Sequence, residues 1–136
     1  MCKIGDIIGV SKYIGQDGVK IPFHYFIVIS DEKGKIYGFD FDIVGIVMSS
    51  FKNEEQKTKK IKYDENLEII EEEFDIGNRK KRRGFIKADQ LYYFDKNKTN
   101  FYVVGQVDGD VLIKLLEKIG YLDKKNKLKL NIENIT

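Results

Sequence analysis

The sequence predicts a mainly β protein, a small antiparallel β-barrel capped by one C-terminal helix. Short runs rich in aromatic and β-branched residues recur along the chain, separated by charged or glycine-containing turns. Gly38 and Gly45 fall inside two of these runs, where they indicate the bulges or bends that a small barrel needs to close. One helical pattern follows near the C-terminus. This succession of elements is typical of a barrel with a helix packed on it.

Length and composition favour a single domain over residues 1–136. The chain is 42% hydrophobic and 34% charged, and its size allows burial of roughly two thirds of the unfolded surface. No apolar run approaches the ~20 residues of a membrane span, so we expect no membrane association. The start lacks a signal-peptide core and Cys2 is the only cysteine, so we expect a cytoplasmic protein. With one cysteine and one histidine, we expect no zinc site and no other cofactor.

The first part of the chain contains four apolar runs. The predicted strands are residues 4–10, 23–30, 36–41 and 43–48. Residues 11–22 are predicted to form a loop, because Gly15 and Gly18 are turn residues and Pro22, the only proline, ends the segment. Residues 31–35 are predicted to form a hairpin loop.

The middle of the chain is more polar. Residues 49–60 are either a loop or a short helix, and residues 71–83 are predicted to be a charged loop. Extended segments are predicted at residues 61–63 and 67–70, on the barrel edge, and at residues 85–94 and 101–107.

The helical pattern covers residues 111–119, where apolar side chains recur on one helix face. Either Asp108 or Asp110 is suited to cap its N-terminus, and Gly120 is predicted to end it. Apolar and polar residues then alternate within residues 124–136. This tail is either an additional edge strand, which could pair across a dimer interface, or a loose extension.

Two polar features stand out. Lys87 and Asp89 share one face of a predicted strand, where they are either a general acid and base or a surface ion pair worth at most ~1 kcal/mol. Gln90 faces the other way and is more typical of a structural amide. The net charge is only +2, but residues 79–83 form a basic run, which is either a phosphate-binding element or a solvated loop.

Several short segments occur in an order that resembles the MazF/PemK family of toxins, over residues from about 4 to 119. The segments are Gly5-Asp6, the strand from His24 to Ser30, the strand from Ile46 to Ser50, Asp89-Gln90, and the turn from Gly105 to Asp108 into the helix. The resemblance implies an SH3-like barrel that forms a homodimer and is inhibited by an antitoxin protein. It also implies metal-independent cleavage of single-stranded RNA, in which the 2′-hydroxyl attacks the adjacent phosphate and leaves a cyclic phosphate and a 5′-hydroxyl.

The resemblance also suggests site residues. His24 stands where the family has a catalytic arginine, and Ser49 (or Ser50, with a shift of one residue) stands at a Thr/Ser position. Lys87 replaces an arginine, and Asp89 matches directly. The resulting hypothesis makes His24 an acid or base with Asp89 as its counterpart, while Lys87 and Ser49 hold the phosphate. The expected RNA contacts are Arg79, Arg82, Arg83 and Gln90.

The sequence also fits a second, non-catalytic function. His24 lies in an apolar strand, where a lone histidine is more often structural than catalytic. An imidazole cannot form the two parallel hydrogen bonds to a phosphate that arginine forms. The second hypothesis is therefore a non-catalytic barrel that binds RNA or a protein partner. Strand aromatics usually pack in a core, but those exposed beside basic residues are candidates for stacking on unpaired bases. These aromatics are Tyr92, Tyr93, Phe94, Phe101 and Tyr102.

Overall fold

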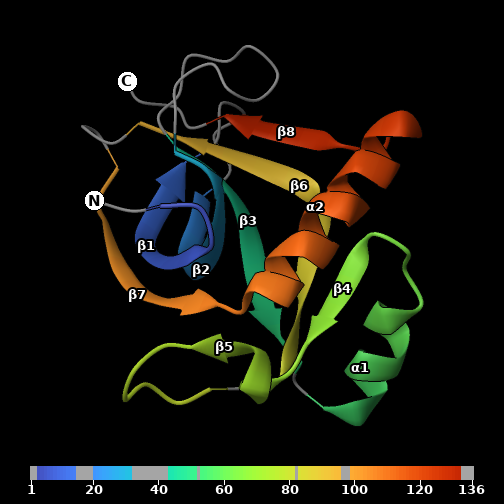
Figure 1. Cartoon of the computed structure of the whole chain (residues 1–136), viewed down its shortest axis with the longest axis horizontal. Coiled ribbons are helices and arrows are strands. Elements are labelled where there is room, and N and C mark those ends of the chain that lie inside the picture. The colour runs from blue at the N-terminus through green and yellow to red at the C-terminus, as the bar shows by residue number, and fades with distance from the viewer. Residues whose placement is uncertain are drawn as a thin grey trace.

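The computed structural model describes residues 3–14, 20–31, 43–51, 53–81, 83–95 and 99–132. Within these residues, eight strands form one curled sheet, accompanied by two α-helices and a 3₁₀ turn (Figure 1). The strands are β1 (Asp6–Ile14), β2 (Lys20–Ser30), β3 (Ile43–Ser50), β4 (Asn66–Ile69), β5 (Phe74–Asp75), β6 (Gly84–Phe94), β7 (Phe101–Val107) and β8 (Lys129–Ile132). The helical elements are α1 (Glu54–Ile61), η1 (Glu71–Glu73) and α2 (Gly109–Lys124).

The sheet has the strand order β4-β6-β3-β2-β1-β7-β5, and β8 also pairs with β6. Every described pairing is antiparallel except that of β6 with β8, which is parallel. The sheet curls into a half-barrel, and α2 lies across one of its faces (Figure 1). The prediction of a mainly β fold, with a barrel-like sheet and a C-terminal helix, is confirmed.

Successive residues of the central strands point alternately into two hydrophobic clusters. Ile7, Ile27 and Ile46 belong to the larger cluster, which also contains the buried face of α2. The residues that α2 contributes are Val111, Leu115, Ile119 and Leu122. The smaller cluster centres on Phe26, whose ring makes edge-to-face contacts with Tyr92 and Phe94 at 5.2 and 5.1 Å between centroids. Because both faces of these strands are buried, their sequences are continuously apolar instead of alternating.

A bulge lies next to Gly45, but its extra residue is Ile29 on the partner strand β2 and not the glycine. The ladder between β2 and β3 shifts register between Val28, which pairs with Gly45, and Ser30, which pairs with Val44. An ideal Cβ on Gly45 would lie only 3.2 Å from the Cβ atom of Phe26, so a larger residue would crowd the smaller cluster. Gly38 and the strand expected at residues 36–41 lie outside the described residues.

A larger irregularity interrupts β6 at Lys87-Ala88-Asp89-Gln90. Ile46 on β3 pairs with Leu91, but Met48, two residues further along β3, pairs with Ile86, five residues back along β6. Residues 87–90 therefore have no partner on β3. On the other edge of β6, the backbone partner changes from β4 to β8 across the same four residues.

Two predicted segments before residue 64 have other boundaries in the structure, so these predictions were wrong. Residues 11–14 and 20–22 were expected in a loop, but they extend β1 and β2, with Lys12 opposite Pro22 and Ile14 opposite Lys20. Among the described residues, β2 pairs with β3 only from Tyr25 onward, so Pro22 lies in a part of the strand that pairs with β1 alone. Residues 61–63 were expected to be extended, but Ile61 ends α1 and a turn follows.

The end of the C-terminal helix was also wrongly predicted. Helix α2 continues past Gly120 to Lys124, because Leu122 extends its apolar face into the core. Asn126, with φ of 56°, adopts the left-handed conformation that ends the helix instead. Asp108 holds the N-cap position, although its side chain makes no capping hydrogen bond.

The C-terminal tail contributes β8, so the edge-strand alternative for this segment is confirmed, with β6 of the same chain as its partner. Neither α1 nor α2 is at once long and apolar enough to cross a membrane, and no other described helix is.

Candidate functional site

A pocket of about 400 Å³ brings together three of the four residues predicted to be catalytic. His24 reaches it from β2, Ser49 from β3 and Lys87 from β6. We call it the His24 pocket. Its remaining lining residues are Tyr25, Met48, Ser50, Gln56, Lys60 and Phe85. Both candidate serines therefore line it.

Strand pairing explains why these side chains meet. Tyr25 pairs with Met48, which places the preceding His24 beside Ser49 at the end of the β2–β3 ladder. Ser49 in turn pairs with Phe85 on β6, two residues before Lys87. The pocket thus lies where three neighbouring strands end their regular pairing, at the edge of the register break in β6.

Helix α1 supplies the other side of the pocket. Gln56 and Lys60 are four residues apart, so they lie on the same face of the helix. The helix begins at a well-formed cap, in which the side chain of Asn53 accepts a 2.8 Å hydrogen bond from the backbone N–H of Gln56. This cap fixes where the first turn of α1 stands against β3.

The pocket is electropositive. The ammonium groups of Lys60 and Lys87 lie 5.9 and 6.0 Å from the centroid of the Phe85 ring, so both cations lie near one aromatic side chain. Phe85 is held in place by stacking on Phe51, with 5.2 Å between centroids. No aspartate or glutamate occurs among the described residues that line this pocket. Two ammonium groups, two hydroxyls and an imidazole in one pocket suit an anionic ligand such as a phosphate.

Asp89 lies outside the pocket, unlike the other predicted catalytic residues. No ion pair joins it to Lys87 within the described part of the chain, although the two residues lie only two positions apart on β6. Burial raises the pKa of the Asp89 carboxyl, and the nearby charge of Glu65 adds to that rise, while Lys87 and Lys129 oppose it. A carboxyl in this position retains its proton more readily than a solvated one.

Gln90 accepts a 3.2 Å hydrogen bond from the hydroxyl of Tyr92, an arrangement that fits the structural role considered for this amide. Burial raises the pKa of Tyr92, and the charge of Asp89 raises it further. The segment with Asp89, Gln90 and Tyr92 is thus a second polar group on β6, separate from the His24 pocket.

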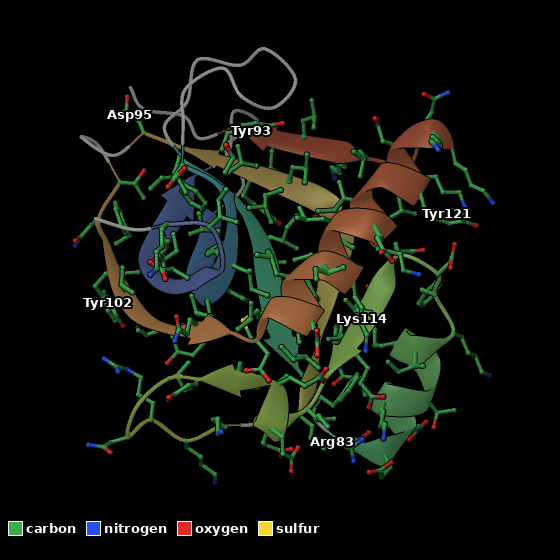
Figure 2. All side chains as sticks on the ribbon, viewed as in Figure 1. Arg83, Tyr93, Asp95, Tyr102, Lys114 and Tyr121 are labelled. Atoms are coloured by element: carbon green, nitrogen blue, oxygen red, sulfur yellow. The ribbon has the colours of Figure 1, made fainter. Side chains whose placement is uncertain are left out.

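Of the arginines in the basic run that the structure describes, Arg79 and Arg83, neither lines the His24 pocket. Arg79 lies 5.9 Å from the ring of Tyr102, an exposed residue of β7, and its guanidinium donates a 3.4 Å hydrogen bond to the Ile76 carbonyl. Arg83 lies beside α1, well away from Tyr102 (Figure 2). Arg82 lies outside the described residues.

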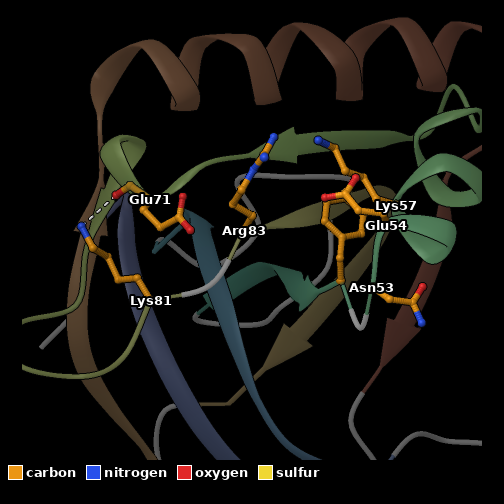
Figure 3. Close-up of a pocket in the computed structure, with 7 residues that line it drawn as sticks. Asn53, Glu54, Lys57, Glu71, Lys81 and Arg83 are labelled. Carbon is orange, nitrogen blue, oxygen red and sulfur yellow. Dashed lines mark hydrogen bonds between the residues drawn. The ribbon is translucent and has the colours of Figure 1, made fainter.

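Arg83 lines a different pocket of about 380 Å³, between α1 and the charged loop (Figure 3). Its guanidinium contacts the Glu68 carboxylate at 3.0 Å, and Lys57 contacts the same oxygen at 3.3 Å. On the other side of this pocket, Lys81 donates a 2.8 Å hydrogen bond to the Glu71 carbonyl. These cations are thus already engaged with acceptors of the protein itself.

Five lining residues were not predicted as site residues from the sequence: Tyr25, Met48, Gln56, Lys60 and Phe85. The spacing of Gln56 and Lys60 could have identified a shared helix face, had the short helix been preferred over the loop. Phe85 carried no such signal, because its part in the pocket depends on the long-range pairing of β3 with β6.

No group of three or more His, Cys, Asp or Glu side chains in the described ranges is arranged to hold a metal ion. Searches against protein-family models and against curated proteins find no match to this chain.

Proposed function

We propose that this protein is an endoribonuclease that cleaves single-stranded RNA in the His24 pocket. The observation that carries the proposal is the composition of that pocket, in which the only histidine of the chain lies with two serines and two lysines. A phosphodiester needs cationic or hydrogen-bonding groups around its oxygens and a group that can take up a proton near neutral pH. The pocket contains both.

The reaction assigned to the pocket forms a bond from the 2′-oxygen to phosphorus as the bond to the 5′-oxygen breaks. His24, in its neutral form, takes the proton of the 2′-hydroxyl. One of the two ammonium groups, from Lys60 or Lys87, gives a proton to the departing 5′-oxygen. The other offsets the negative charge that builds on the phosphate. The products are a cyclic phosphate and a 5′-hydroxyl, and the steps assigned to these side chains involve no metal ion.

This assignment changes the hypothesis drawn from the sequence in one respect. Asp89 was expected to be the acid–base counterpart of His24, but it does not line the pocket, so the lysines take that role in the proposal. The sequence resemblance to MazF/PemK toxins supports the same activity. With it come three further proposals: that the protein is a homodimer, that a cognate antitoxin covers its RNA site, and that it acts in the cytoplasm.

The test is cleavage of a long single-stranded RNA by purified protein in the presence of EDTA. We expect 5′-hydroxyl ends and a rate that falls by roughly 10²- to 10⁴-fold in His24→Ala, the usual contribution of a general acid or base. Asp89→Asn serves as the comparison, because this residue is polar and near the pocket but does not line it, and it should retain most of the activity. Thermal unfolding of each variant verifies that it is folded.

A non-catalytic RNA-binding barrel is the second candidate. It is favoured by the position of Asp89, the predicted acid–base counterpart of His24, which does not line the pocket. This candidate predicts salt-dependent binding of RNA with no cleavage by the folded wild-type protein. Retention of full cleavage in His24→Ala would instead contradict the assignment of the active site.

A further inference from the structure

A second pocket adjoins the His24 pocket and shares part of its wall. It has a volume of about 460 Å³ and contains Phe74 and Lys80, and we call it the Phe74 pocket. The two pockets have four residues in common: Tyr25, Met48, Ser49 and Ser50. A ligand seated in one pocket therefore lies directly beside the other.

The two pockets differ in chemistry. Ile69, Phe74 and Ile76 form buried apolar walls of the Phe74 pocket, with 1%, 6% and 2% of their surfaces exposed. Tyr25 and Met48 add a partly buried aromatic ring and a thioether. A mostly apolar cavity with few polar groups at its rim is typical of sites for flat organic ligands. The neighbouring His24 pocket has the lysines and the imidazole instead.

We propose that the Phe74 pocket binds one unpaired base of the RNA whose phosphate lies in the His24 pocket. This inference rests on the proposed function. Each nucleotide joins an anionic phosphate to a flat, largely apolar base through one sugar, and the two adjoining pockets present those two chemistries in the same order. Entry of a base requires that it be unstacked and unpaired, so the pocket favours single strands over duplexes.

Lys80 is the residue that gives this pocket a polar rim. Its side chain is exposed, it lines the Phe74 pocket, and it does not line the His24 pocket. An ammonium group has donors and no acceptor, so it reads carbonyl and ring-nitrogen acceptors on a base edge. Its neighbour Lys81 does not line this pocket; it donates hydrogen bonds to the carbonyls of Glu71 and Phe74 at 2.8 and 3.2 Å, and its ammonium lies 5.7 Å from the centroid of the Phe74 ring.

The test measures binding without turnover. The probes are 2′-O-methyl pentanucleotides, which lack the attacking hydroxyl. Of the four homopolymers, the one bound most tightly is remade with a single base removed at each position in turn. Removing the base that enters the Phe74 pocket should weaken binding by roughly tenfold, as expected for loss of one stacked base, while the other removals should have smaller effects. Equal affinity for all abasic strands and the intact strand would overturn the inference.

Lys80→Met separates contact with the base from contact with the backbone. It should weaken binding of the intact strand and leave binding of the critical abasic strand unchanged, because the group that Lys80 contacts is then missing. An equal loss on both strands would place Lys80 on a phosphate and contradict the proposed role. Lys114→Met is the matched control, because Lys114 is exposed on α2 (Figure 2) and lines neither pocket.

These outcomes distinguish the inference from the function on which it rests. Cleavage of RNA, together with no effect of any base removal, would overturn the base pocket alone. Binding that depends on one base, with no cleavage, would support the pocket and contradict the ribonuclease. Failure of the folded wild-type protein to bind any of the strands would overturn both.

Discussion

Gly84 on β6 lies directly against the backbone of Ser49 on β3. An ideal Cβ on Gly84 would overlap the carbonyl oxygen of Ser49 and would lie 3.1 Å from the Cα atom of Ser50. Gly84 also pairs with Ile69 on β4, so three strands meet at this residue. Because Gly84 has no side chain, the backbone of Ser49 and Ser50 can pack directly against it, in the wall that the His24 and Phe74 pockets share.

Gly84→Ala should move Ser49 and damage both the fold and the site. Because the obstructing atoms belong to the backbone, relief requires displacement of β3, and we expect a loss of about 1–3 kcal/mol in the free energy of unfolding. RNA affinity should fall with it. Denaturant titration and RNA binding measure the two effects. Gly120→Ala is the control, since an ideal Cβ there meets no atom within 4 Å, and it should raise stability by about 0.5–1 kcal/mol. Wild-type stability in Gly84→Ala would contradict the packing argument.

Lys60 and Lys87 should each contribute to the salt dependence of RNA binding. Each contact between a lysine and a phosphate makes the slope of log K against log salt more negative by about 0.7 for a single strand, so removing one contact should make the slope shallower by that amount. Lys60→Met and Lys87→Met retain the long apolar stem, so packing against Phe85 is largely preserved. Fluorescence anisotropy between about 50 and 200 mM salt measures the slope. An unchanged slope in both variants, equal to that of Lys114→Met, would exclude these ammonium groups from phosphate binding.

The sequence was sufficient to predict the strands that form the core. The runs around Phe26, Ile46 and Phe94 are continuously apolar, and this pattern depends only on local composition. The bulge in the β2–β3 ladder was predictable only in its neighbourhood, because Gly45 indicates a local irregularity but the extra residue is Ile29 on β2. The end of α2 was not, since a helix continues through an exposed glycine when a residue beyond it, here Leu122, still packs in the core.

The site was only partly predictable. His24, Ser49 and Lys87 were identified from the sequence resemblance, and the structure places all three around one pocket. Asp89 was assigned to the same strand face as Lys87 on the assumption of a regular strand. The pocket includes Lys87 but not Asp89, and β6 changes its backbone partner from β4 at Lys87 to β8 at Gln90. Such long-range pairing leaves no pattern in the local sequence.

Asp89 should make the protein less stable as the pH rises. Burial raises the pKa of its carboxyl above the ordinary 3.8, so the folded chain binds the proton more tightly than the unfolded chain. Stability attributable to Asp89 is therefore greatest below pH 3.8 and is lost as the pH rises through the folded-state pKa. At neutral pH the folded state holds a charge that burial disfavours. Asp89→Asn should accordingly raise the neutral-pH unfolding midpoint and flatten the acidic part of the profile.

Asp64 provides a comparison of opposite sign. A hydrogen bond from Lys118 and another from Tyr121 lower the pKa of the Asp64 carboxyl below 3.8. Its contribution to stability is present above pH 3.8 and is lost as the pH falls through the folded-state pKa. Asp64→Asn should therefore lower the unfolding midpoint at neutral pH. Thermal unfolding of both variants from pH 3 to 8 measures the profiles, and a neutral-pH decrease in Asp89→Asn would contradict the assigned cost of burial.

Glu68 should limit the affinity of the protein for RNA. One oxygen of its carboxylate contacts both Arg83, at 3.0 Å, and Lys57, at 3.3 Å, so two cations on the surface of the pocket in Figure 3 are partly neutralised. Glu68→Gln removes this charge and leaves Arg83 and Lys57 to interact with phosphates.

We expect Glu68→Gln to bind single-stranded RNA about threefold more tightly at low salt and to show a steeper salt dependence. Stability should change by less than about 1 kcal/mol, because these ion pairs are exposed to solvent. Glu117→Gln, on the exposed face of α2, makes the same change in net charge away from the pocket and should leave affinity close to that of the wild type. An increase of the same size in both variants would indicate an effect of net charge alone. Weaker binding in Glu68→Gln would instead show that the carboxylate positions Arg83 for the RNA, and that the ion pair belongs to the binding surface.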